Sequence, residues 1–215
     1  MSSTDYRHFG GLEMVKAGRP RAAEEVVSGT ESVRERILNT ARDLFYREGA
    51  RSVGVDTVVA QSGVAKTSLY RWFPSKDALI AAVIEAEAKD RWAGWDYTAQ
   101  RSPPDAREQL RAQLAGIAKF VSSPKYRGCP FMNVTVEFAD DQHPARLVAR
   151  GVMEELRRRV RALIDKIGVR EPAIVTDQIV MLVDGAFSGA QVFGKDGPQQ
   201  LLVTAADALI DAQKK

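Results

Sequence analysis

Apolar residues recur along most of the chain at intervals of three and four positions, the spacing that places side chains on one face of an α-helix. The first segment with this spacing begins at the capping signature Ser32-x-x-Glu35 and ends at Gly49. Its inward face consists of four apolar residues: Ile37, Ala41, Leu44 and Phe45. The pattern therefore predicts an amphipathic helix of about four turns.

Two shorter helices are expected over residues 55–62 and 65–72, with Gly63 between them. Glycine readily adopts the left-handed conformation that ends a helix, so Gly63 marks a turn. Leu69 and Phe73 have the spacing needed to hold the second short helix against its neighbours. Three small helices at the start of the folded region predict a compact head.

A long fourth helix follows Ser75, whose hydroxyl can cap it, and further helical segments follow residue 95. These segments start close to residues 103, 129, 144, 172 and 198. We find no alternating strand pattern and no internal repeat in the sequence. The sequence therefore predicts an all-α fold of about nine helices, with a three-helix head and a larger C-terminal helical domain.

Composition narrows the class of protein without identifying it. Hydrophobic residues make up 45% of the 215 residues and charged residues 27%, which is ordinary for a globular protein. A single cysteine, Cys129, excludes an internal disulfide framework or a multi-cysteine zinc site, and two histidines leave little for metal chemistry. Because neither a signal peptide nor a run of membrane-spanning length is evident, we expect a cytoplasmic protein with no membrane partner, no metal and no cofactor.

The charge of +3 is small, but its distribution is informative. Residues 32–76 hold eight basic residues against four acidic ones.

Two short helices joined at a glycine turn and packed on a longer helix are what a helix-turn-helix requires. The outward side of the second helix offers donors suited to base edges or phosphates: Lys66, Thr67, Ser68, Tyr70 and Arg71. Ser75 and Lys76 open the next helix, where backbone N–H groups and a cation suit a phosphate. The alternative is a solvated helix face without a ligand.

The stretch "RERILNTARDLFYREGARSVGVDTVVAQSGVAKTSLYRWFPSKDALIAAV", residues 34–83, resembles the DNA-binding head of the tetracycline-repressor (TetR) family of bacterial transcription regulators. Its core, "SGVAKTSLYRWFPSKDAL", carries most of the likeness. The resemblance implies that the third helix is the recognition helix and that the C-terminal helices bind a small-molecule effector and a second subunit. It also implies four residues that contact a double-stranded DNA operator: Lys66, Thr67, Tyr70 and Lys76.

We therefore expect three regions: a flexible arm over residues 1–30, a helix-turn-helix domain over 31–76, and a ligand-binding and dimerisation domain over 77–215. The sequence departs from the family pattern at Ala65, where a serine would cap the recognition helix. It departs again at Val53-Gly54, where a hydroxyl residue usually precedes the second helix.

The N-terminal arm contains Gly18-Arg19-Pro20-Arg21, which is similar to the core of an AT-hook. In that motif an extended Arg-Pro-Arg lies in a narrow minor groove, where the negative potential is enhanced. Arg19 and Arg21 are therefore candidate minor-groove contacts. The alternative is a disordered tail with incidental charges.

Residues 172–193 are apolar over so much of the helix circumference that two packing partners are expected. Small residues on this helix would permit close approach of another helix. Together with the last helix, it could form a four-helix interface in a homodimer, the alternative being a central core helix of a monomer. The predicted dimer contacts are Val175, Ile179, Leu182, Gly185, Ala186, Gly189, Leu202 and Leu209.

Large apolar side chains in the C-terminal domain could line a cavity for an apolar or aromatic effector, although ordinary core filling is the commoner role of each residue taken alone. The apolar candidates are Trp92, Trp95, Phe120, Phe131, Met132, Phe138, Met153, Met181 and Phe187, and the candidate polar groups that orient the effector are Asn133, Thr135, Glu137 and Gln191.

The function expected from these features is a ligand-responsive transcriptional regulator, most simply a repressor, that is released from a palindromic operator by its effector. One alternative is a helical small-molecule-binding or interaction protein that does not read DNA. A catalytic pairing of Cys129 with His143 is the enzymatic alternative, and no other nucleophile-base motif is present. Cys129 could also sense oxidants, although a small buried hydrophobe is its commoner role.

Overall fold

The computed structural model describes residues 32–214, and all regular secondary structure in this range is helical. Nine α-helices and two short 3-10 helices, η1 (Gly194–Asp196) and η2 (Pro198–Leu201), follow one another there, which confirms the predicted all-α class. The α-helices are α1 (Val33–Glu48), α2 (Val55–Ser62), α3 (Lys66–Trp72), α4 (Lys76–Arg101), α5 (Ala106–Val121), α6 (Pro130–Glu137), α7 (Pro144–Ile167), α8 (Pro172–Phe193) and α9 (Leu202–Asp211).

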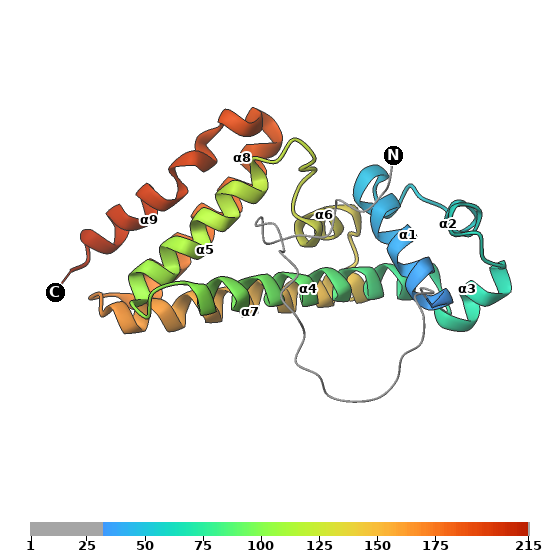
Figure 1. The fold of residues 1–215 in the computed structure, drawn as a ribbon, viewed down its shortest axis with the longest axis horizontal. Coiled ribbons are helices and arrows are strands. Elements are labelled where there is room, and N and C mark those ends of the chain that lie inside the picture. Colours follow the sequence, from blue (N-terminus) through green and yellow to red (C-terminus); the bar gives the residue numbers. More distant parts are fainter. Residues whose placement is uncertain (1–31, 215) are drawn as a thin grey trace.

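The head consists of α1, α2 and α3 at one end of the molecule (Figure 1). The predicted capping box is present, because the Glu35 N–H donates to the Ser32 hydroxyl at 3.2 Å and the Ser32 N–H donates to the Glu35 carboxylate at 3.1 Å. Gly63 ends α2 with φ of 64°, the left-handed conformation that favours glycine. Leu69 and Phe73 are buried, as expected for the anchors of α3.

The long helices α4 and α7 pack along one another and form the spine of the molecule (Figure 1). The N-terminal part of α4 buries Leu79, Ile80 and Val83 and packs against α1, while its C-terminal part belongs to the body. A boundary placed between residues 76 and 77 therefore falls in the first turn of a helix that both parts share. The head and the body are therefore joined by one continuous helix.

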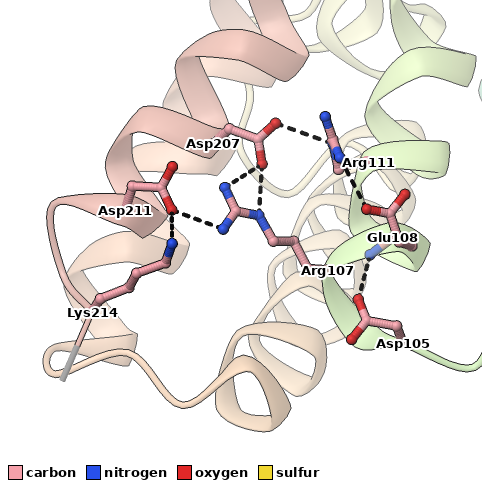
Figure 2. Close-up of polar contacts among 7 residues, drawn as sticks. All are labelled: Asp105, Arg107, Glu108, Arg111, Asp207, Asp211 and Lys214. Carbon is pink, nitrogen blue, oxygen red and sulfur yellow. Dashed lines mark hydrogen bonds and ion pairs between the residues drawn. The ribbon is translucent and has the colours of Figure 1, made fainter.

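The body is completed by α5, α8 and α9 at the far end, with α6 between them and the head (Figure 1). Side chains on α5 and α9 form a polar cluster that holds α9 against α5 (Figure 2). The Arg107 guanidinium donates to Asp207 at 2.9 Å and to Asp211 at 2.8 Å. Arg111 adds a contact of 3.1 Å to Asp207, and Lys214 one of 2.7 Å to Asp211.

Two helix starts differ from the expected ones. α5 begins after Asp105, whose carboxylate accepts the Glu108 N–H at 2.9 Å, so the preceding two prolines lie outside the helix. The last segment begins with the 3-10 helix η2 (Pro198–Leu201), and α9 follows it. The Gln199 side chain donates to the Gly194 carbonyl at 2.6 Å, which fixes this tight turn before the α-helix starts.

The expectation that no apolar run approaches membrane-spanning length is wrong for one segment. Residues Pro172–Asp196 form a helical stretch that is long and apolar enough by length and composition alone. Core helices of globular proteins satisfy the same criterion, and one face of α8 is buried against α5, α7 and α9. The apolarity of α8 therefore comes from two faces, one buried in the protomer and one open.

Candidate nucleic-acid interface

The outward side of α3 carries the polar side chains that the sequence singled out. Lys66, Thr67, Tyr70 and Arg71 are exposed, and Ser68 is half-buried. Two buried residues on the opposite side hold α3 in place, because Leu69 is completely buried and Phe73 is buried next to it in the core. The short helix thus holds a row of hydrogen-bond donors on its open side.

Lys66 makes an ion pair that the sequence did not reveal. Its ammonium lies 2.7 Å from the carboxylate of Asp56, in the first turn of α2. Both side chains are exposed, at 52% for Lys66 and 80% for Asp56. The hydrogen bond to Asp56 raises the pKa of Lys66 above its ordinary value. By contrast, Arg71 makes no ion pair within residues 32–214.

Ser75 and Lys76 have structural contacts of their own. The Ser75 hydroxyl caps α4 by accepting the Ala78 N–H at 3.0 Å. The Lys76 ammonium donates to the backbone carbonyl of Arg51 at 2.9 Å, and its partial burial lowers its pKa. Because an ammonium has three N–H donors, Lys76 can keep this bond and still offer a donor to a phosphate. Arg19 and Arg21, the minor-groove candidates, lie outside the described residues.

The departures from the family pattern have the expected local effect. Ala65 and Gly54 stand at the N-caps of α3 and α2, and neither helix has a side-chain capping bond. Thr57 and Val58 nevertheless bond to the Gly54 carbonyl, and the Ala65 carbonyl accepts from Ser68 and Leu69. The two helices therefore start from backbone contacts alone.

The head and body meet where the turn after α1 contacts the end of α6. The Arg51 N–H donates to the Glu137 carboxylate at 2.7 Å. Near the start of α4, the Nε2 atom of His143 lies 3.4 Å from Asp77, and the His143 ring stacks on Phe138 with centroids 4.0 Å apart. The contacts of Arg51 with Glu137 and of Asp77 with His143 join segments far apart in the sequence, and no local pattern predicts them.

A second link joins α1 directly to α4. Arg42 donates to Glu87 at 2.9 Å and to Asp90 at 2.7 Å. A small hollow opens beside this link between α1, α4 and α6, and two of the candidate orienting groups, Asn133 and Glu137, line it, whereas none of the apolar candidates does. Its polar lining includes Arg42, Glu87, Asn133 and Glu137.

The predicted pocket residues occupy several different environments. Phe131 and Phe187 are buried, whereas Trp92, Trp95, Phe120, Met132, Phe138 and Met153 are partly buried and Thr135 is exposed. Phe138 belongs to the head–body junction through its stacking on His143. Met181 is 71% exposed on the open face of α8, so its assignment to an interior cavity is wrong for the protomer.

Arg91 stands at the centre of the buried group and was missed by the sequence reasoning. Its guanidinium lies 5.1 Å from the ring centroid of Phe131 and 5.3 Å from that of Phe187. One of its nitrogen atoms is 3.9 Å from Cys129 Sγ, and burial lowers its pKa. Asp184, on α8, interacts electrostatically with this cation, and burial raises the pKa of that carboxyl. The surroundings of Arg91 therefore combine aromatic rings with buried polar groups.

The predicted dimer residues do not all lie on an open surface. Val175, Ile179 and Ala186 on α8 are buried because this face of α8 packs against α7 and α9 of the same chain, and Leu202 is buried at the start of α9. They are core residues and are unavailable to a second chain. Gly185 is exposed, and Leu182, Gly189 and Leu209 are partly buried. The open apolar side chains are instead Ile174, Met181, Val192, Phe193 and Leu201.

Cys129 and His143 do not form a nucleophile-base pair. Burial raises the pKa of the Cys129 thiol, which lies beside Arg91. His143 accepts the Ala145 N–H on Nδ1 at 3.2 Å, and its other nitrogen faces Asp77. Each residue is thus held by different neighbours.

Comparison with known proteins gives two family matches. Residues 37–83 match the model of bacterial regulatory proteins of the tetR family, and residues 106–206 match that of a tetracyclin repressor-like C-terminal domain. The chain is 22% identical to the HTH-type transcriptional regulator YjdC of Escherichia coli over 157 residues, which cover 72% of this chain and 81% of YjdC.

Solved structures give the same result. A TetR-family transcriptional regulator from Streptomyces coelicolor superposes with a TM-score of 0.80 at 28% identity, covering 85% of this chain and 96% of that one. A chain described as a TetR transcriptional regulator from Streptomyces avermitilis superposes with a TM-score of 0.73 at 30% identity, covering 85% and 98%. The likeness thus extends over the head and the body together.

Proposed function

The chain belongs to the TetR family of bacterial regulatory proteins, and on this premise we propose that it is a ligand-responsive transcriptional repressor that binds a palindromic operator as a homodimer. The observation that carries this proposal is the outward side of α3. It presents Lys66, Thr67, Tyr70 and Arg71 to solvent above a fully buried anchor, Leu69. A short helix with this division of faces fits the major groove.

The side chains of the interface divide into two roles. We expect Lys66, Thr67 and Ser68, at the start of α3, to contact base edges, because only this end of a recognition helix needs to enter the groove. Tyr70, Arg71, Ser75 and Lys76 flank that end and supply donors to the phosphate backbone.

The open face of α8 is the observation that supports a homodimer. Five large apolar side chains lie more than half exposed on α8 and the turn after it: Ile174, Met181, Val192, Phe193 and Leu201. Soluble monomers rarely leave a contiguous apolar face of this kind uncovered. A second copy of the chain, meeting this face around a two-fold axis at Gly185, would cover it and place two α3 helices on a palindromic site.

The effector is proposed to bind among α4, α6 and α8, near Phe131, Phe187 and the partly buried Trp92. Since α4 continues from this region into the head, a ligand that prefers one tilt of α4 changes the separation of the two recognition helices. A coupling of about 1–3 kcal/mol is typical of such linkage.

A mobility-shift titration with DNA from upstream of the protein's own gene tests the proposal. We expect a discrete, salt-dependent complex that a scrambled duplex of the same length does not compete away. Equal binding to both duplexes would favour the alternative, a helical small-molecule-binding or interaction protein that does not read DNA.

A further inference from the structure

The ion pair between Asp56 and Lys66 places a negative charge at the edge of the candidate interface. Asp56 lies in the first turn of α2, and Lys66 is the first residue of α3. The carboxylate and ammonium are 2.7 Å apart, and the Asp56 side chain is 80% exposed. The pair bridges the two helices of the helix-turn-helix at its open side.

An acidic group here is unfavourable for binding any phosphate. DNA carries a negative charge on every phosphate, so a carboxylate near the start of the recognition helix repels the backbone. Asp56 also neutralises part of the charge of the Lys66 ammonium, so the attraction of Lys66 for a phosphate is weaker. Both effects weaken sequence-independent binding, which depends almost entirely on such contacts.

Binding to a base edge is affected less. An ammonium has three N–H donors, and the contact with Asp56 engages one side of the group. The remaining donors can reach the O6 and N7 acceptors of a guanine while the ion pair persists. Asp56 would in that case hold the Lys66 ammonium in a fixed position for the base and add the rigidity that a flexible lysine side chain lacks.

We propose that Asp56 is a specificity-determining residue, which weakens non-specific DNA binding more than operator binding by restraining Lys66. This inference rests on the proposed function, because it assigns a role within the same DNA interface. It predicts that neutralising Asp56 makes the protein a tighter but less selective binder.

The test uses the full-length protein and two duplexes, one selected from a random pool by the wild-type protein and one scrambled version of it. Dissociation constants are measured by fluorescence anisotropy over a series of salt concentrations. For Asp56→Asn we expect binding to the scrambled duplex to tighten about two- to five-fold, the range that corresponds to an exposed ion pair. Binding to the selected duplex should change less, so the ratio of the two affinities falls. The salt dependence on scrambled DNA should steepen by about one phosphate contact.

Two variants separate this role from a general charge effect. Glu48→Gln removes one negative charge from an exposed position at the end of α1 and should leave the ratio unchanged. In a Lys66→Ala background, Asp56→Asn should no longer change the ratio of the two affinities, because the restrained cation is absent and the remaining charge effect acts on both duplexes alike. Circular dichroism and thermal melting confirm that each variant is folded.

The outcomes are distinct. An equal change on both duplexes for Asp56→Asn, or an undiminished effect in the Lys66→Ala background, would overturn the inference while leaving the regulator proposal intact. If the wild-type protein enriches no duplex from the pool, the proposed function fails, and this inference fails with it.

Discussion

The carboxylate of Glu137, at the end of α6, accepts a 2.7 Å hydrogen bond from the backbone N–H of Arg51, in the turn between α1 and α2. This bond joins the head to the body at a point outside the shared helix α4. A Cβ on Gly49 would approach the same carboxylate at 3.5 Å, so the turn and the side chain fit closely. The head is thus held by α6 as well as by α4.

Replacement of Glu137 by alanine should loosen this junction. A hydrogen bond to a charged group contributes about 1.5–3 kcal/mol when buried and less when partly exposed, so we expect the thermal midpoint to fall by about 2–4 °C. Calorimetry measures the change. Glu137→Gln is the matched control, because it retains an oxygen acceptor and should lose less; equal losses for both variants would contradict a role for the acceptor.

The polar cluster of α5 and α9 should make the docking of α9 sensitive to acid. Hydrogen bonds from Arg107 and Lys214 hold the pKa of Asp211 below its usual value of 3.8. A carboxyl whose pKa is depressed on folding contributes stability above its unfolded pKa and loses it as the pH falls towards the folded pKa. Docking of α9 should therefore weaken only below about pH 4.

NMR titration of the Asp211 carboxyl carbon in the wild type and in Arg107→Ala tests this. The depressed pKa should move back towards the ordinary aspartate value in the variant, because the first of its two cationic partners is gone. An unchanged pKa of Asp211 in Arg107→Ala would contradict a contribution from the contact between Arg107 and Asp211 that Figure 2 shows.

Cys129 should be almost unreactive in the native protein. The thiol is 2% exposed, and burial raises its pKa, so little thiolate is present at neutral pH. We expect the reaction with a water-soluble disulfide reagent at pH 7.5 to be slow in the native protein and to become fast in denaturant. Rapid native reaction would favour a sensor role for Cys129.

The open face of α8 should hold the dimer together. Met181→Arg places a charge on a side chain that is 71% exposed in the protomer, so it leaves the core intact while disfavouring an apolar contact. Sedimentation analysis should show a shift from dimer to monomer at micromolar concentration. Val136→Asp alters a still more exposed apolar residue on α6 and should leave the dimer unchanged; dimer loss in both variants, or in neither, would contradict this assignment.

Local signals in the sequence predicted local structure well. The Ser32–Glu35 capping box and the Gly63 turn involve residues within four positions of one another, and both are present. The apolar positions of α8 were also identified, but periodicity does not tell a face buried by the same chain from one that a second chain covers. For that reason Val175 and Met181 were each placed on the wrong side.

Contacts between distant segments could not be predicted in this way. Asp56 and Lys66 are ten positions apart on different helices, and only the angle of the helix-turn-helix brings them together. Arg91 sits in the polar-looking run "AEAKDRW", where nothing local indicates that its guanidinium is buried between Phe131 and Phe187.

The most direct test of the central claim compares two tyrosines of similar exposure, Tyr70 on α3 at 43% and Tyr97 on the body part of α4 at 40%. Affinity for a duplex selected by the wild-type protein is measured by fluorescence anisotropy for Tyr70→Ala, Lys66→Ala and Tyr97→Ala. If the outward side of α3 reads DNA, the first two variants should bind about ten-fold or more weakly, and Tyr97→Ala should bind like the wild type. Wild-type affinity in both α3 variants would contradict the claim.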